Sequence, residues 1–308
     1  LVEAARQDAL RKGHGSEESP MYRFTLHAPS YMPAMRFLDS DALRKELFTA
    51  RTRIAHTGEF EKEPLIREII QLRNEKARLL GKDLFPDWVL SRRMAKNGAR
   101  ALEFVDDLFL KTKPAFDREN EELIAFKAEQ TGGAPEPLSP WESGYWAEKL
   151  RRRKFDFDEE ELRPYFPLPS VMSGLFTLAE RLFGIRVTEQ TDPKPETWHP
   201  DVRCYAISDA STGRHIGSFY ADWFPRESKR SGAWMSGLHT GKPQSDGLLS
   251  PHMGLIAGNM TPQLGDKPSL LTHREVETVF HEFGHLLHHV LSEVKIRSLS
   301  GTNVAWDF

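Results

Sequence analysis

The sequence predicts a mainly α-helical protein with a small β-sheet late in the chain. Three observations support this fold class. Apolar residues recur at helical spacing through most of residues 40–130, alternating segments typical of a hairpin occupy residues 203–223, and a helix with a capping signal follows at 273–293. With 308 residues, 39% of them hydrophobic, the chain is long enough to bury a sizeable core.

The N-terminal half is predicted to be almost entirely helical. After a polar loop, residues 22–27 alternate well enough for a short strand, which Pro29 and Pro33 then end. Helical patterns follow around residues 65–80 and 87–110, and Pro114 is expected to open another helix that ends near Gly132. The apolar positions of the first pattern are Leu65, Ile66, Ile69, Ile70, Leu72, Leu79 and Leu80, and Gly81 is the expected C-cap.

The segment TGGAPEPLSP (131–140) has the composition of a linker, and a long loop between two helices is an equal alternative. We therefore expect two regions. Residues 1–130 form a helical region with a short N-terminal strand, and residues 131–308 form a region of helices and a small sheet. One continuous catalytic domain is the alternative.

The C-terminal half changes in character. A helix at 141–154 ends in Arg151–Arg153, which we interpret as a solvated surface compensated by the acidic residues that follow, and another apolar-faced helix covers 170–183. Residues 203–223 are predicted to form a β-hairpin, and 232–235 and 252–260 are further strands. Thr272 is the expected N-cap of the last helix, with Glu275 completing a capping box.

Composition excludes several classes of protein. Aromatic residues make up 10% of the chain, which argues against disorder, and no run of 18 apolar residues suggests a membrane span. The 42 basic and 45 acidic residues give a net charge of −3, which favours neither a nucleic-acid nor a membrane partner. Cys204 is the single cysteine, which excludes an intrachain disulfide and fits a reducing compartment. We expect a cytoplasmic location.

The last helix contains His281-Glu282-Phe283-Gly284-His285, an HExxH pattern. Two histidines four residues apart lie one turn apart on the same helix face, so both imidazoles can reach one zinc ion. Zinc lowers the pKa of a water molecule that it binds, and Glu282 can accept a proton from that water as general base. The alternative is a pair of core histidines whose hydrogen bonds go to carbonyl groups. His288 and His289 are interpreted as surface or packing residues, with a role as extra ligands as the alternative.

The sequence resembles the thimet oligopeptidase and oligopeptidase A family of zinc metallopeptidases, and the bacterial oligopeptidase A branch in particular. The resemblance is carried by HEFGHLLHH with the preceding LLTHREVETVF, and it continues upstream through nearly the whole chain. The other matching segments are YRFTLHAPSYMP (22–33), FDFDEEELRPYFPLPSVMSGLFTLAERLFGI (155–185), WHPDV (198–202), IGSFYADWFPRESKRSGAWM (216–235) and GLIAGNMTP (254–262).

The resemblance implies a two-lobed helical metallopeptidase fold with a small β-sheet beside the HExxH helix. It implies a zinc endopeptidase that cleaves short peptides, with His281 and His285 as zinc ligands and Glu282 as the general base. The intact protein is expected to be a monomer. The segment Gly217–Met235 is expected near the substrate channel, where a sheet edge can bind an extended peptide or can be a plain structural hairpin.

The sequence departs from the pattern of this family at its C-terminal end. The family's third zinc ligand is a Glu roughly 25 residues beyond the second histidine, near position 310, and its oxyanion-stabilising Tyr and His lie further on. Glu293, the nearest downstream Glu, sits two turns along the same predicted helix. We therefore expect the chain to be part of a longer protein, with both ends cut through folded sequence, and to be inactive alone. A dipeptidyl carboxypeptidase or mitochondrial intermediate peptidase, and a non-catalytic scaffold, are the alternatives.

Overall fold

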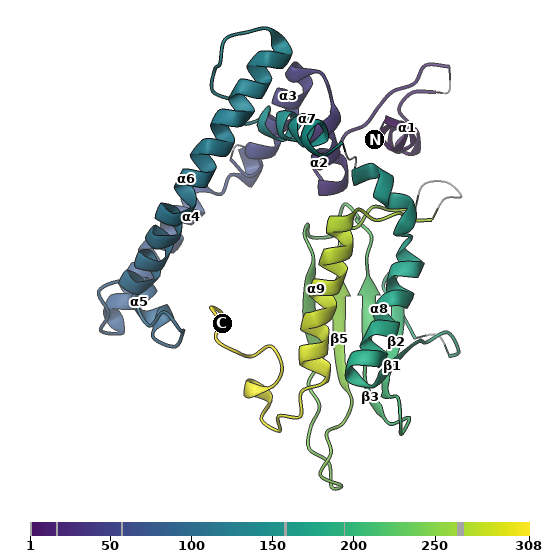
Figure 1. Ribbon diagram of the computed structural model, residues 1–308. Coiled ribbons are helices and arrows are strands. Elements are labelled where there is room, and N and C mark those ends of the chain that lie inside the picture. The colour runs from purple at the N-terminus through teal and green to yellow at the C-terminus, as the bar shows by residue number, and fades with distance from the viewer. Residues whose placement is uncertain (1, 17, 57, 157–158, 194, 264–267) are drawn as a thin grey trace. The chain divides into compact units, whose positions relative to one another are not determined.

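The fold was analysed in a computed structural model that describes residues 2–16, 18–56, 58–156, 159–193, 195–263 and 268–308. The chain divides into two compact units (Figure 1). The first unit comprises Leu1–Ser30 with Asp158–Asn303, and the second comprises Tyr31–Phe157 with Val304–Phe308. The boundary expected at 130/131 falls inside the second unit, and the expected domain division stays a prediction.

Helices make up most of the regular structure, and a five-stranded sheet lies in the first unit, so the mainly α-helical class is confirmed. The helices are α1 (Val2–Arg11), α2 (Ala28–Phe37), α3 (Asp41–Thr52), α4 (Glu63–Leu79), α5 (Phe85–Leu90), α6 (Gly98–Thr131), α7 (Ser143–Phe155), α8 (Leu168–Phe183) and α9 (His273–Val290). Among the described helices, none combines the length and the apolar character needed to cross a bilayer.

The sheet has the strand order β1-β2-β3-β5-β4 and mixes both pairing directions. The strands are β1 (Ile185–Glu189), β2 (Arg203–Asp209), β3 (His215–Asp222), β4 (Trp234–His239) and β5 (His252–Ala257). Strands β1, β2 and β3 pair antiparallel, β3 and β5 pair parallel, and β5 and β4 pair antiparallel. The predicted hairpin of β2 and β3 is confirmed, and β1 is a strand that the sequence analysis did not identify.

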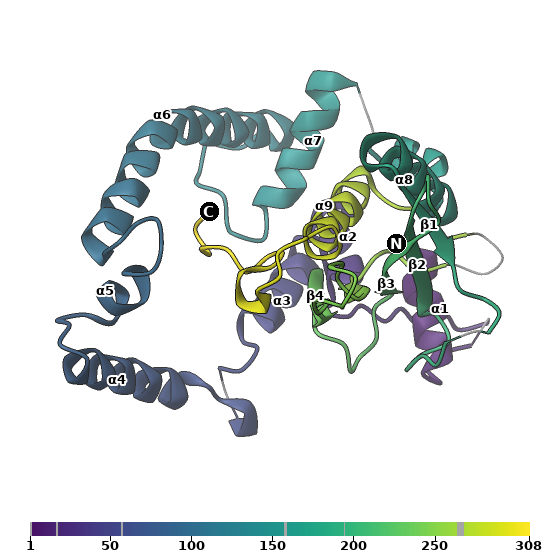
Figure 2. The ribbon, with the colours of Figure 1, turned by 90° about the horizontal axis from the view of Figure 1, so that it is seen from below.

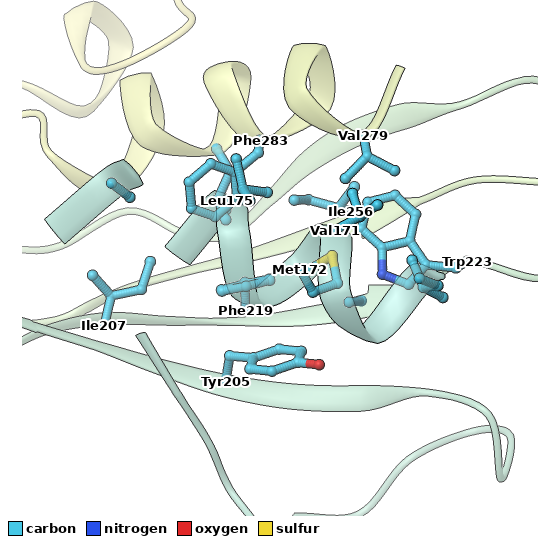
Figure 3. Packing of buried hydrophobic residues seen from close by; sticks show 14 of the residues in the cluster. Val171, Met172, Leu175, Tyr205, Ile207, Phe219, Trp223, Ile256, Val279 and Phe283 are labelled. Atoms are coloured by element: carbon cyan, nitrogen blue, oxygen red, sulfur yellow. The ribbon is translucent and has the colours of Figure 1, made fainter. Parts of the chain in front are cut away.

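The core of the first unit lies between this sheet and the helices α8 and α9 (Figure 3). Phe283 of α9 packs edge-on against Phe219 of β3, with ring centroids 6.1 Å apart. Phe219 stacks in turn on Tyr205 of β2 at 5.0 Å. Burying such rings removes large apolar areas from water, and this burial holds α9 on the sheet.

The predicted strand at residues 22–27 is wrong: this segment is irregular and leads directly into α2. Pro29, expected to be a breaker, is the second residue of α2, where a missing N–H costs no helical hydrogen bond. Pro33 lies inside the same helix. A weak alternation over six residues therefore gave the wrong secondary structure.

The second unit contains α6, which packs against α7 (Figure 2). The expectation that Pro114 opens a new helix is wrong, because α6 runs without interruption from Gly98 to Thr131. Only one N–H is missing from its 34 residues, and many turns on either side maintain the helix. Its predicted end is confirmed, since Gly132 closes it with a φ of 67°.

The segment 131–140 connects two helices that contact each other, which is the loop alternative rather than a linker between units. The arginines at the end of α7 pair with acidic residues, among them two that precede them in the sequence. Arg153 pairs with Glu129 of α6 at 2.6 Å, and Arg151 pairs with the buried Glu148 at 2.8 Å. These pairs are consistent with a structural role for the cluster.

Candidate metal centre

The helix that carries the HExxH motif begins at a confirmed capping box. The Thr272 hydroxyl accepts a hydrogen bond from the backbone N–H of Glu275 at 3.1 Å, and the Glu275 carboxylate accepts one from the N–H of Thr272 at 2.7 Å. The same carboxylate accepts hydrogen bonds from the N–H and hydroxyl of Thr261, which follows β5. The start of α9 is thus held by hydrogen bonds within its own first turn and by hydrogen bonds to the segment that follows β5.

One face of α9 is buried and the neighbouring face is exposed. Val279, Phe283, Leu286 and Val290 lie in the core, as the apolar spacing predicts. The residues on the neighbouring face are exposed, and they are Glu277, His281, His285 and His288. Phe280 is apolar but 38% exposed. The helix therefore presents its candidate metal ligands away from the core.

His281 and His285 point toward the same place. Their Nε2 atoms are 3.1 Å apart, and their ring centroids are 4.7 Å apart. Two imidazoles bound tetrahedrally to one zinc ion, each at about 2.05 Å, hold their nitrogens about 3.3 Å apart. The pair therefore fits two adjacent positions of a zinc site with little movement. The alternative of core histidines bonded to carbonyl groups does not describe His281 and His285, because both are exposed.

Glu282 is the buried member of the motif, with 7% of its surface exposed. Among the residues that the structure describes, no hydrogen-bond or ion-pair partner occupies its carboxylate. A buried carboxylate usually has such a partner, because desolvation of a charge is costly. The carboxylate of Glu282, which follows His281 directly in the sequence, is thus free of protein partners within the described residues.

No third ligand accompanies the two histidines in the described part of the chain, where no group of three or more His, Cys, Asp and Glu side chains is placed to hold a metal ion. Glu293 was expected on the same helix, and this was wrong: α9 ends at Val290, so Glu293 lies in the exposed segment after it. A catalytic zinc site needs three protein ligands. The described residues offer two candidates, His281 and His285.

The other histidines of the helix differ from each other. His288 is exposed, whereas His289 is buried, and its Nε2 lies 3.1 Å from the carbonyl oxygen of His239 and 3.2 Å from that of Met253. The interpretation of these two residues as surface and packing histidines is therefore confirmed. Apart from its own helix, nothing in the described chain lies within 4 Å of a Cβ placed at Gly284.

The edge of the sheet nearest to α9 is β4, which contacts the helix and ends the strand order. The expectation placed the binding edge in Gly217–Met235, but most of this segment is the interior strand β3 and a loop. Only Trp234 and Met235 of that segment lie on the edge strand. The sequence alone did not indicate Gly237, Gly254 and His252, which shape the contact between α9 and the sheet. Glycines inside strands were the available signal.

HExxH on a helix is a sequence pattern of metallopeptidases, and here it consists of two exposed histidines and a buried glutamate. Comparison with known proteins gives the family. Residues 34–308 match Peptidase family M3, so the chain belongs to peptidase family M3.

Individual relatives agree with this assignment. The chain is 39% identical to oligopeptidase A of Haemophilus influenzae over 99% of its length, and 36% identical to oligopeptidase A of Escherichia coli over 95%. It is 35% identical to dipeptidyl carboxypeptidase of Escherichia coli over 90% of its length. These matches cover 44%, 43% and 40% of the relatives, so the chain spans less than half the length of these proteins.

Proposed function

We propose that the complete protein containing this chain is a cytoplasmic, monomeric zinc endopeptidase that hydrolyses short peptides. The observation that carries the proposal is the pair of exposed imidazole nitrogens 3.1 Å apart beside the buried Glu282. Membership of peptidase family M3 and the similarity to oligopeptidase A support it. The two-lobed arrangement of the complete protein is part of the same proposal and rests on the resemblance.

In this proposal His281 and His285 hold the ion through Nε2. Zinc, when bound, polarises the scissile carbonyl and makes a water molecule more acidic. Glu282 accepts a proton from the attacking water at its carboxylate and then delivers it to the leaving amine.

Strand β4 supplies a surface for the backbone of the substrate. Within the described chain no strand pairs with its outer edge, so its outward N–H and C=O groups remain available to an extended peptide. The edge is short, running only from Trp234 to His239. Binding of this kind uses main-chain hydrogen bonds, which suits an enzyme that accepts many short sequences.

We further propose that the chain alone has little or no peptidase activity, because two ligands do not hold a catalytic zinc ion. The resemblance places a third ligand and the oxyanion residues beyond Phe308. The purified chain is assayed with zinc on a quenched short peptide, and no turnover is expected. Turnover that is abolished both by a chelator and by Glu282→Gln would show that the described residues are sufficient.

Zinc binding to the chain tests the ligands separately from activity. Equilibrium dialysis should show that His285→Ala weakens zinc binding about tenfold or more, since one of two ligands is lost. His288→Ala is the matched control on the next turn, and it should leave binding within about twofold because His288 is not part of the pair. Equal weakening by both variants would contradict the assignment of His281 and His285.

A dipeptidyl carboxypeptidase activity is the second candidate, favoured by the 35% identity to the Escherichia coli enzyme of that name. The bonds at which a peptide is cleaved distinguish the endopeptidase from the dipeptidyl carboxypeptidase activity. An endopeptidase cuts a peptide with an amidated C-terminus at internal bonds, whereas a dipeptidyl carboxypeptidase releases dipeptides and requires a free carboxylate. We expect the complete protein to cleave the amidated peptide.

A further inference from the structure

Two glycines leave a notch, a small recess without side chains, where α9 packs on the edge of the sheet. Gly237 of β4 and Gly254 of β5 are direct partners in the antiparallel ladder. A Cβ on Gly254 would lie 2.5 Å from Cδ1 of Leu286, and one on Gly237 would lie 2.9 Å from Cε1 of His289. Leu286 and His289 are three residues apart on one face of α9, so the paired glycines accommodate both side chains at once.

His289 joins the helix to both strands by hydrogen bonds. The two carbonyl groups that accept from its Nε2–H belong to His239 and Met253, which are partners in the ladder between β4 and β5. The register shifts between Gly237 and His239, so the bonds fall at an irregular point of the ladder. Because His289 is only 5% exposed, loss of its donor would leave these carbonyl groups with one partner fewer in a buried place.

His252 fixes the C-terminal end of the same helix. Its ring packs edge-on against His289 with centroids 5.2 Å apart. Its Nδ1 accepts a hydrogen bond from the N–H of Gly241 at 3.2 Å, and its Nε2–H donates to the carbonyl oxygen of Ser292 at 3.1 Å, just after α9. Burial, together with the neighbouring His289 and His239, lowers the pKa of His252, so the ring remains neutral and holds this tautomer.

These contacts determine how α9 lies along β4. Apolar packing alone resists sliding and rotation of α9 only weakly. The notch and the two hydrogen bonds from His289 to carbonyl groups each fit only one register of the helix on the sheet. The exposed ligands His281 and His285 are on this helix, one and two turns before His289. A change at His289 would therefore change the separation between the ligands and the outer edge of β4.

We propose that His289 is a positioning residue that sets the distance between the metal-binding face of α9 and the outer edge of β4, where the substrate backbone binds. This inference rests on the function proposed above. His289 touches neither the metal nor the peptide, so it acts on the affinity for peptides through β4. The chemistry at Glu282 is left intact.

Hydrogen exchange of the 308-residue chain tests the contact between His289 and β4, and it needs no peptidase activity. His289→Met removes the donor at similar volume, whereas His289→Gln retains a side-chain N–H donor in its amide group. Val290→Ala is the control, because Val290 is a fully packed neighbour on the same helix that makes no such bond. We expect His289→Met to raise exchange in residues 234–239 about tenfold and His289→Gln much less. Equal exchange in His289→Met and Val290→Ala would overturn the proposal.

Kinetics of the complete gene product test the consequence for the substrate. His289→Met should raise KM for a short peptide about fivefold with kcat within about twofold, since an interaction common to the ground and transition states is weakened. His289→Gln should restore most of the KM, and Val290→Ala should leave it unchanged. A fall in kcat alone, or an unchanged KM, would overturn the inference.

Two further outcomes are informative. If the wild-type gene product hydrolyses no peptide, the proposed function fails, whereas the exchange experiment still decides whether His289 fixes β4. If His289→Met does not fold, Gly237→Ala replaces it, because the added methyl group meets the same imidazole ring. It should give the same pattern of exchange and KM, and wild-type behaviour in this variant would contradict the proposal.

Discussion

Asp222, at the end of β3, is a carboxylate that several side chains hold by hydrogen bonds. It accepts two hydrogen bonds from Arg226, one from the indole N–H of Trp198 and one from Lys229. Burial alone would raise the pKa of Asp222, but these bonds outweigh it and lower the pKa to about 2. The Lys229 side chain is itself only 5% exposed, and burial lowers its pKa. The cluster holds together the loop that leads from β3 to β4.

Asp222→Asn should lower the free energy of unfolding at pH 7 by on the order of 3 kcal/mol, because Lys229 would be left as a buried charge without its partner. The pKa of Asp222 is lowered in the fold, so its contribution is complete above pH 4 and is lost as the pH falls toward 2. Urea unfolding at several pH values should therefore show the variant and wild type converging below pH 4. The exposed Glu293→Gln is the control, and a difference that stays constant with pH would contradict this account.

The residues of the site differ in how well the sequence predicts them. HExxH spacing on a helix is sufficient to predict that His281 and His285 lie on the same face of α9, because helix geometry alone fixes their separation. His289 and His252 are 37 residues apart in sequence, and their contact depends on how β4 and β5 pair. No local pattern specifies that pairing, so the notch of Gly237 and Gly254 becomes visible only in the fold.

At the scale of elements, α9 is predicted closely because its signals are local and agree with one another. The capping box, the apolar spacing and the motif all specify the same helix, and only its end was placed three residues too late. The strand at 22–27 and the break at Pro114 failed for the opposite reason. Each rested on one weak signal, and the surrounding structure decided the outcome.

Thr272→Ala tests the contribution of the cap. We expect the free energy of unfolding to fall by about 1 kcal/mol, because the N–H of Glu275 loses its acceptor at the start of α9. Thr278→Ala is the matched control, since the Thr278 hydroxyl bonds only to a carbonyl within the helix. Urea unfolding, followed by circular dichroism, measures the free energy of unfolding of both variants. A loss as large for Thr278→Ala as for Thr272→Ala would contradict a specific role for the cap.

At the scale of the whole molecule, the sequence predicts the family better than the packing. The motif segments lie mainly in the first unit, and the family match, over residues 34–308, includes residues of both units. The apolar spacing in α4 correctly predicts a helix, yet Ile66, Ile69 and Ile70 are 45–55% exposed. Periodicity identifies the apolar face of a helix, but it carries no information about which surface covers that face.

The central claim is that α9 carries a zinc site in which Glu282 moves the proton. The most direct test is hydrolysis of a quenched short peptide by the complete gene product, measured after metal removal and again after zinc is restored. Zinc should restore activity, and Glu282→Gln should lower kcat about 100-fold or more while its zinc content stays unchanged. Wild-type kcat in zinc-loaded Glu282→Gln would contradict the account.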